Sequence, residues 1–275
     1  MRIYASAVYL FLYAPIALIV LFSFNAGRSG LQFFCCSTQW YGRSFSNSLM
    51  LEALSNSLVI AGVSATLATI MGTIAALALQ RVRSGLRVFY DALIYSAIIV
   101  PGIVIGIATL VALNTLFGIL NPLLSALAGP DGVPFQLRLG VGSVIAAHTL
   151  FNMALVIVIV RARMSGMDRS LIEASADLYA TPWRTFRQVT LPQLLPAVLS
   201  GFLLSFTFSF DEFIIAFFVA GPTITLPIYI FSSIRRGVTP EINVIATVVM
   251  TVSLTLLVLA QQSLQRQRRA AAGKA

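Results

Sequence analysis

The sequence predicts an all-α, polytopic membrane protein with six transmembrane helices. Of its 275 residues 58% are hydrophobic, and only 18 are basic and 9 acidic. A soluble domain of this size needs more polar surface than that. The apolar residues also gather in six runs of about the 20 residues that a bilayer core requires. No repeat or linker interrupts them, so we expect a single transmembrane domain over residues 1–275.

The six runs have features that fit spanning helices. The first is longer than a signal-peptide core and lacks a convincing cleavage site, so we expect it to be an uncleaved span. The second is rich in Gly, Ala, Ser and Thr, which favours close packing between membrane helices. Turn-forming residues fill the outer loops between the later runs. The runs are Tyr4–Phe24, Leu54–Leu79, Tyr90–Phe117, Leu139–Val160, Ala197–Ala220 and Asn243–Leu259.

The distribution of charge sets the expected orientation. A net charge of +9 is compatible with nucleic-acid binding, but the basic residues lie in gaps between apolar runs and form no continuous face. With the N-terminus inside, 13 of the basic residues fall in inner segments and 5 in outer loops. This bias predicts that both termini and residues 161–196 lie in the cytoplasm.

Two classes of site are excluded by composition. Lys274, in the tail, is the one lysine of the chain, so the sequence has no lysine-containing phosphate loop for ATP. Cys35 and Cys36 are adjacent and would bridge only with strain, and a metal site would need ligands beyond them and the distant His148. We expect the cysteines to be structural or incidental and the chain to bind no cofactor or metal.

The longest basic interruption, residues 161–196, resembles a docking element more than a simple connector. Ser170 and Glu173 fit a capping box that starts a short helix. Thr181-Pro182 fits a second start, with an N-cap followed by proline at the first helical position. Trp183 and Phe186 give that helix an apolar edge, and we expect the unit to close at Leu191-Pro192. The residues alone allow two interpretations: a plug for a groove on another protein, or an elbow on the inner leaflet.

A resemblance favours the plug. Glu173-Ala174-Ser175, followed by Val189-Thr190-Leu191-Pro192, is similar to the EAA motif of the permeases of ABC importers, a MetI-like fold with six spans. The family pattern has a glycine where this chain has Tyr179, which puts the exact helix break in doubt. The resemblance implies that this loop docks on a cytoplasmic ATPase subunit through Ser170, Glu173, Ala174, Ser175, Asp177, Leu178, Tyr179, Ala180, Leu191 and Pro192.

The same resemblance implies a set of partners. They are a homologous permease subunit, which makes a heterodimer the expectation, two ATPase subunits that carry ATP and Mg, and an extracytoplasmic solute-binding protein. Membrane lipid surrounds the chain and no nucleic acid is expected. The chain itself would then be a multi-pass transport subunit of the inner (plasma) membrane, not an enzyme.

A pair of acids lies in the fifth run. Carboxylates at such depth cost at least about 2.5 kcal/mol each on insertion scales and normally face a cavity or a partner. Asp211 and Glu212 would point about 100° apart on a helix, with Ser205 and Ser209 on the Glu212 face. One interpretation is an ion pair with Arg138 or Arg235. The other is an anionic path for a cationic solute, with nearby phenylalanines for cation–π contact.

Short segments along nearly the whole chain resemble the second permease subunit of spermidine/putrescine importers. They include Gln39-Trp40-Tyr41, Asn56-Ser57-Leu58, Pro101-Gly102, Ser209-Phe210-Asp211-Glu212 and Gly221-Pro222. The resemblance implies polyamine import. Two alternatives remain: a permease of this class for iron, an opine or another small organic solute, and a stand-alone secondary transporter. We expect His148 to be a packing residue more than a ligand.

Overall fold

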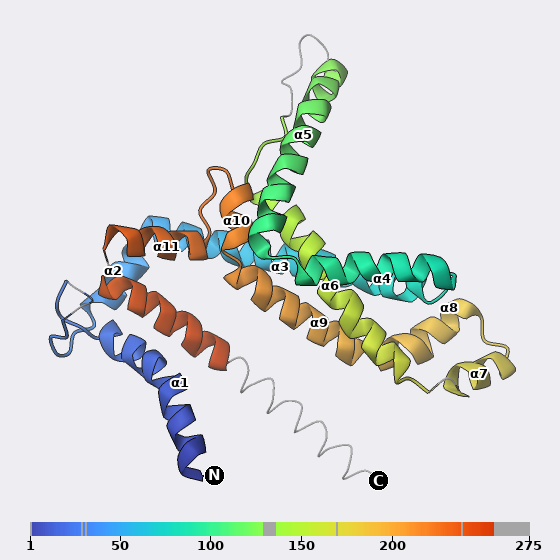
Figure 1. Ribbon diagram of the computed structural model, residues 1–275, viewed down its shortest axis with the longest axis horizontal. Coiled ribbons are helices and arrows are strands. Elements are labelled where there is room, and N and C mark those ends of the chain that lie inside the picture. The colour runs from blue at the N-terminus through green and yellow to red at the C-terminus, as the bar shows by residue number, and fades with distance from the viewer. Residues whose placement is uncertain are drawn as a thin grey trace. The chain divides into compact units, whose positions relative to one another are not determined.

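The computed structural model describes residues 2–28, 30, 32–128, 136–168, 170–237 and 239–255. Within these residues the chain is helical and contains no strand (Figure 1). A further apolar helix covers Pro240–Thr255. The labelled elements are α1 (Arg2–Ser23), α2 (Gln39–Ser46), α3 (Ser48–Leu79), α4 (Ser84–Ile99), α5 (Gly102–Ala128), α6 (Val141–Ser165), α7 (Ser170–Asp177), α8 (Pro182–Thr185), the π-helical turn η1 (Phe186–Thr190), α9 (Leu191–Asp211), α10 (Ile214–Val219) and α11 (Leu226–Arg236).

Five of the described helices are long and apolar enough to cross a bilayer. They contain parts of the first five predicted runs. The sixth run corresponds to the shorter helix Pro240–Thr255, and its last predicted residues lie outside the described ones. The all-α fold class is therefore confirmed. The residues form two compact units, 52–228 and 1–51 with 229–275, so the single domain stays a prediction.

The third run differs from the prediction in two ways, of which the first follows from proline chemistry. The third run is not one helix: α4 ends at Ile99, and α5 begins at Gly102. Val100 is extended (φ −65°, ψ 131°), since a residue before proline avoids the helical region. α5 then runs through Gly118 and Pro122, which were expected in a loop.

The fifth run begins earlier and ends earlier than predicted. Leu191-Pro192 does not close the cytoplasmic unit, because α8, η1 and α9 form one continuous apolar helix from Pro182 to Asp211. The π-helical turn lies just before Pro192, and such a turn accommodates a residue that cannot donate to the helix ladder. The second run also starts earlier, at Ser48, where Asn47 Oδ1 accepts from the amides of Leu49 (3.1 Å) and Met50 (3.3 Å).

The larger unit is built on α6, which packs against α9, α10 and α4. One apolar core lies near residues 161–196 and contains Val156, Val160 and Leu194. A second core contains Ile60, Val144 and Ile215. Small residues permit the close approach: a Cβ on Gly72 would lie 2.8 Å from Val156 Cβ. The packing predicted from the small residues of the second run is therefore confirmed for this helix.

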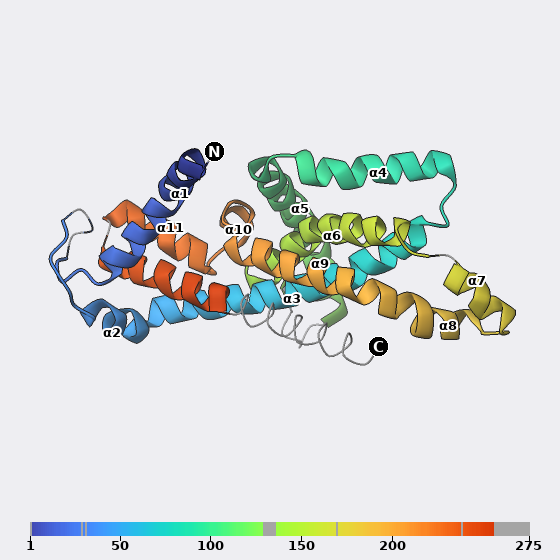
Figure 2. The same ribbon diagram turned by 90° about the horizontal axis from the view of Figure 1, so that it is seen from below.

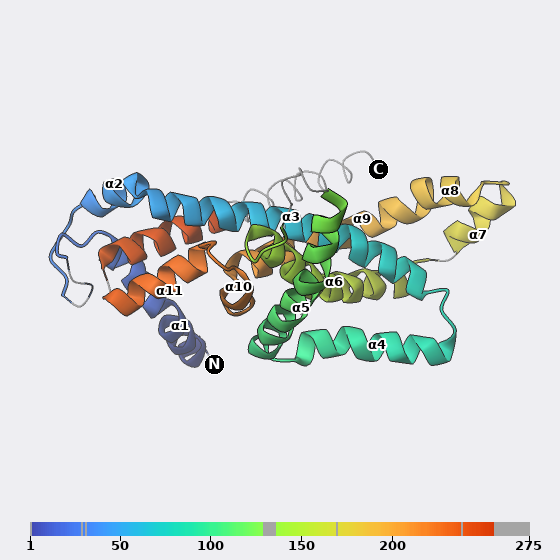
Figure 3. The ribbon, with the colours of Figure 1, turned by 90° about the horizontal axis from the view of Figure 1, so that it is seen from above.

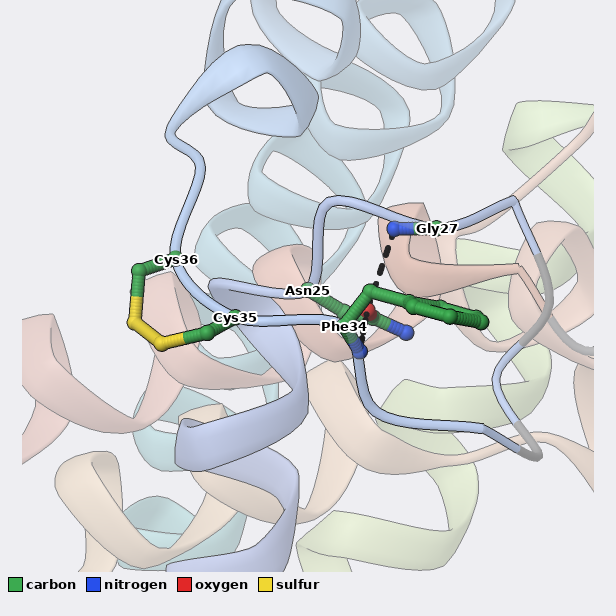
Figure 4. The surroundings of a disulfide bond; sticks show 5 residues. All are labelled: Asn25, Gly27, Phe34, Cys35 and Cys36. Carbon is green, nitrogen blue, oxygen red and sulfur yellow. Dashed lines mark hydrogen bonds between the residues drawn. A yellow bond between two sulfur atoms is a disulfide. The ribbon is translucent and has the colours of Figure 1, made fainter.

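The smaller unit contains a loop organised by one buried side chain. Asn25 is fully buried; its Oδ1 accepts from the amides of Gly27 (3.0 Å) and Phe34 (2.8 Å), and its Nδ2 donates to the carbonyl of Gln32 (2.7 Å) (Figure 4). Beside it a disulfide joins Cys35 to Cys36. Both cysteines are exposed, and Cys36 has a φ of 76°, a conformation that costs energy for a residue with a Cβ.

Candidate functional site

The candidate site has two parts, both in the larger unit. The first is the α7–α8 hairpin, which lies at one end of α9 (Figure 2). The second is the break between α9 and α10, where the acid pair lies. The residues carrying the predicted motif all fall in or next to the hairpin.

The α7 start differs from the predicted capping box. Ser170 is the first helical residue, not the cap, and Asp168 Oδ1 accepts from its amide at 2.9 Å. This i to i+2 arrangement is an Asx-turn that leads into the helix. The hydrogen bond from the Ser170 backbone holds the pKa of the Asp168 carboxyl below its usual value. Sequence reasoning missed this residue although Asp is a common turn former.

The turn that ends α7 is formed at Tyr179, the position where the family pattern has glycine. Tyr179 has a φ of 57°, the amide of Ala180 donates to the carbonyl of Ser175 (3.0 Å), and that of Tyr179 donates to Ala176 (2.9 Å). These two bonds are the pair that defines a Schellman motif, with Tyr179 in the left-handed position. The helix therefore breaks where the family pattern has glycine, and the tyrosine carries the strain.

The second helix starts as predicted. Thr181 is extended (φ −66°, ψ 153°), its hydroxyl accepts from the Arg184 amide at 3.4 Å, and Pro182 is the first helical residue. The two short helices are joined by a hydrogen bond between the hydroxyls of Ser175 and Thr185 (2.9 Å). The stacked rings of Trp183 and Phe186 lie 5.7 Å apart.

The hairpin leaves apolar side chains uncovered within this chain. Leu178 is 81% exposed, Tyr179 95% and Trp183 67%. Glu173 and Ala174 are also exposed. An exposed apolar edge on a compact helical hairpin is the surface that helix-in-groove docking requires.

Behind the hairpin, an ion pair joins α4 to α6. Arg161 Nη1 contacts Asp91 Oδ1, and Nη2 lies 3.3 Å from Oδ2. It is the one ion pair among the described residues. This pair was not predicted from the sequence. Asp91 lies at the start of the third run and Arg161 just after the fourth, and charged residues at such positions are candidates for pairing.

The acid pair does not lie on one helix. α9 ends at Asp211, and Glu212 is extended (φ −73°, ψ 108°), so Glu212 does not continue the face of Ser205 and Ser209. Its Oε1 instead accepts from the amide of Ile215 at 3.0 Å and so caps α10. Asp211 is exposed within this chain. Of the proposed ion-pair partners, Arg138 donates to Gln136 (2.8 Å), and Arg235 belongs to the other unit.

The two serines lie inside the helix bundle. Ser205 and Ser209 are 0% and 4% exposed. The Ser209 hydroxyl lies 2.7 Å from His148 Nδ1 and 2.8 Å from the Ser64 hydroxyl, and so joins α9 to α6 and α3. His148, 2% exposed, is thus a packing histidine as expected. The structure brings Ser209 together with His148 and leaves Asp211 at the surface.

The end of α10 is fastened to the neighbouring helices by side-chain hydrogen bonds. Ser143 on α6 donates to the Val219 carbonyl (2.7 Å), and Asn56 on α3 donates to the Ile224 carbonyl (3.0 Å). Ser57 accepts from the Leu226 amide (2.8 Å). The Asn56-Ser57 segment thus holds the stretch after Gly221, which explains why polar residues begin an otherwise apolar run.

Comparisons with known proteins identify the family of this chain. Residues 68–270 match the family described as the binding-protein-dependent transport system inner membrane component. The chain belongs to this family. It is 39% identical over 242 residues to the putrescine transport system permease protein PotI of Escherichia coli (strain K12), covering 87% of this chain and 82% of PotI. It is 38% identical to the spermidine/putrescine permease protein PotC of Haemophilus influenzae (strain ATCC 51907 / DSM 11121 / KW20 / Rd), covering 92% of each.

Solved structures agree on the fold. A bacterial ABC transporter for the acidic polysaccharide alginate contains a chain with a TM-score of 0.70 at 19% identity, covering 97% of this chain and 94% of that one. The MetNI methionine transporter gives 0.60 at 17%, covering 79% and 95%. The family match and the named relatives show that the protein is a multi-pass inner-membrane transport permease and not an enzyme. Because the family is a component of a binding-protein-dependent system, the stand-alone transporter alternative is wrong.

Proposed function

We propose that this permease imports a polyamine, putrescine or spermidine, as a subunit of an ATP-driven importer. The observation that carries the substrate is the identity of 39% and 38% with permeases named for putrescine and spermidine/putrescine transport, over most of each chain. The solved relatives are named for alginate and methionine, but at 19% and 17% identity they share the fold alone. They therefore give no reason to prefer another solute.

The proposed assembly follows the family. The permease pairs with a homologous permease subunit, two ATPase subunits hold ATP and Mg, and an extracytoplasmic binding protein delivers the solute. One solved relative is in complex with a solute-bound periplasmic protein, which supports this last partner. The excess of basic residues in the inner segments supports cytoplasmic termini and a cytoplasmic 161–196 loop.

The α7–α8 hairpin is the coupling element of this proposal. Its exposed Leu178, Tyr179 and Trp183 would enter a groove of the ATPase, and the Ser175–Thr185 hydrogen bond would keep the two short helices together under load. α8 continues through η1 into α9, so a displacement of the hairpin is carried directly into a spanning helix. ATP shifts the permease between conformations only through its differential contact with them.

Asp211 supplies the charge for the cationic solute. It is the exposed member of the acid pair, at the end of α9, whereas Glu212 is occupied by the α10 amide. Ser205 and Ser209, which the sequence placed on the path, are buried in the helix bundle, so the proposed path follows the Asp211 side of α9 instead. A carboxylate at this depth needs a compensating positive charge, and a passing polyamine provides one.

The test is ATP-dependent uptake of labelled putrescine and spermidine by the reconstituted transporter with its binding protein. We expect Asp211→Asn to reduce uptake by about tenfold or more, equivalent to about 1.4 kcal/mol or more, with ATPase activity retained. Glu212→Gln keeps the capping oxygen, so its uptake should stay close to the wild-type value. Normal uptake by the Asp211→Asn variant would rule out the cationic site.

Coupling is tested separately. Glu173→Ala should weaken ATPase association and reduce uptake, whereas Gln188→Ala, an exposed change outside the motif, should alter neither. Co-purification of the ATPase and stimulated ATP hydrolysis give the two measurements. If Glu173→Ala left both intact, the hairpin assignment would be wrong.

A further inference from the structure

A basic cavity lies behind the hairpin, at the ends of α3, α4 and α6. Its volume is about 490 Å³, and its walls include Arg81, Arg87 and Arg161 together with Glu173. These three helix ends lie in the larger unit, and Figure 3 shows the short connector that leads from the end of α3 into α4. The cavity is distinct from Asp211, which lies at the other end of α9.

The charges around this cavity do not cancel. Arg161 is paired with Asp91, and Glu173 contributes a second carboxylate. Three guanidinium groups against two carboxylates leave one positive charge uncompensated. Arg81 and Arg87 are both exposed, so their donors are available to a ligand. A phosphodiester carries one negative charge and matches guanidinium donors in geometry.

An apolar groove lies next to the basic cavity along the same three helices. Its volume is about 600 Å³, and its lining contains no charged residue. An arginine of the basic cavity lies close in sequence to the groove lining at each of the three helix ends: Arg81 lies two residues after Leu79, Arg87 three residues before Tyr90, and Arg161 four residues after Ile157. In the predicted orientation the groove would lie at the level of the acyl chains and the arginines at the headgroup level.

Aromatic side chains mark the same level. Phe89 and Tyr90 are exposed and in contact, with ring centroids 5.9 Å apart, and Tyr95 is exposed further along α4. Aromatic residues are enriched where membrane helices cross the headgroup region. This places the mouth of the basic cavity at the membrane surface, not in the aqueous phase.

We propose that this cavity and groove form a binding site for one anionic phospholipid of the inner leaflet, with the phosphate on Arg81 and Arg87 and an acyl chain in the apolar groove. The proposal rests on the orientation that puts residues 161–196 in the cytoplasm. Glu173 lines the cavity and belongs to the coupling motif, so the bound headgroup lies beside the element that receives work from the ATPase. The lipid therefore supports coupling as well as packing.

The test uses the assembled transporter in nanodiscs of phosphatidylcholine with and without phosphatidylglycerol. Native mass spectrometry measures how many phosphatidylglycerol molecules remain bound and how tightly. We expect Arg81→Gln and Arg87→Gln each to weaken binding of one phosphatidylglycerol about fivefold, which corresponds to about 1 kcal/mol per basic residue near a membrane surface. Arg83→Gln is the matched control, because Arg83 is exposed in the same connector but does not line the cavity.

A second variant tests the acyl-chain part. Ala97→Phe fills the apolar groove without changing charge and should also weaken phosphatidylglycerol binding. Retention of phosphatidylglycerol by the Arg81→Gln/Arg87→Gln double variant, or equal loss in Arg83→Gln, would overturn the proposal. Displacement of the lipid by inorganic phosphate or glycerol 3-phosphate at equal concentration would assign the site to a soluble anion instead.

The consequence for coupling has its own measurement. ATP hydrolysis stimulated by the binding protein should be higher with phosphatidylglycerol than without it, and the double variant should lose that difference while keeping the rate seen in phosphatidylcholine. Lipid binding is measured without polyamine or ATP, so a failed uptake experiment leaves it standing. Conversely, absent lipid binding would leave the polyamine proposal unaffected.

Discussion

Nδ1 of His148 lies 2.7 Å from the hydroxyl of Ser209, and this contact joins α6 to α9 inside the membrane domain. The same hydroxyl reaches Ser64 on α3 at 2.8 Å. Ser209→Ala would remove both contacts: buried His148 Nδ1 would lose its hydrogen bond, and Ser64 would keep only its bond to the Ala61 carbonyl (3.4 Å). Each lost membrane hydrogen bond is worth about 0.6 kcal/mol on average, so we expect a destabilisation of about 1–2 kcal/mol.

The measurement is the apparent melting temperature of the purified transporter. A loss of this size should lower it by about 2–8 °C. Ser200→Ala is the control, because Ser200 is exposed on the same helix and donates only to its own helix carbonyl at Pro196. Equal effects of the two changes would show that Ser209 does not hold the helices together.

Asp168 predicts a pH dependence of the coupling hairpin. Its folded-state pKa is lowered by the Ser170 amide, so its stabilising contribution is complete above the unfolded pKa and is lost as the pH falls through the folded value. The start of α7 should therefore fray below about pH 4. Hydrogen exchange of the α7 amides, corrected for intrinsic rates, should show the loss.

Two variants separate the hydrogen bond from the charge. Asp168→Asn keeps an oxygen that forms the same turn, so it should preserve α7 protection and abolish the dependence on pH. Asp168→Ala should reduce protection even at neutral pH. Asp177→Asn, at the other end of α7, should change neither, and a pH dependence that survived in Asp168→Asn would contradict the assignment.

Tyr179 predicts that the coupling hairpin is under backbone strain. A left-handed residue with a Cβ costs about 1–2 kcal/mol, and the ring gains no burial in this chain because it is 95% exposed. Tyr179→Gly should therefore slow hydrogen exchange at Ala180 in the permease. Tyr179→Ala keeps the strain while removing the ring, so it should resemble the wild type. Equal exchange in the Gly and Ala variants would show that strain is not the cause.

The sequence was sufficient for features governed by local chemistry. The apolar runs predicted the spans because a bilayer fixes the length of a helix, and Thr181-Pro182 predicted a helix start that the structure confirms. The residue before a proline avoids the helical region, so Pro101 divides the predicted third run: α4 ends at Ile99 and α5 begins at Gly102. The extension of α5 through Pro122 could not be predicted, because turn-forming residues there indicated a loop.

The exact ends of two helices could not be predicted. Glu212 fitted the face of a continuous helix, yet α9 ends at Asp211 and Glu212 caps α10. Likewise, Ser170 fitted a capping box, but Asp168 provides the hydrogen bond. The observed bonds span only three and two residues, so each competes with another local pattern that the same residues allow. The sequence contains both patterns and does not say which one forms.

The last prediction concerns Glu241 in the smaller unit. Its Oε1 accepts from Asn47 Nδ2 (2.8 Å) and from the Tyr229 hydroxyl (3.0 Å), and Asn47 also begins α3. Burial is the main cause that raises the pKa of the Tyr229 phenol, and the nearby Glu241 carboxylate raises it further. The phenol therefore stays protonated and able to donate. Glu241→Ala would remove the acceptor of the Tyr229 hydroxyl, whereas Asn47 Nδ2 would still donate to that hydroxyl (2.9 Å), so we expect a cost of about 1–3 kcal/mol.

Glu241→Gln distinguishes the acceptor from the charge. The amide oxygen can accept both hydrogen bonds, so this variant should melt close to the wild type, whereas Glu241→Ala should melt several degrees lower. In a double-mutant cycle, Tyr229→Phe combined with Glu241→Ala should be less destabilising than the sum of the single changes, by about 0.5–3 kcal/mol. Residues that share a hydrogen bond lose the same interaction in either single variant. If the two single destabilisations added up to that of the double variant, Tyr229 and Glu241 would not stabilise one another.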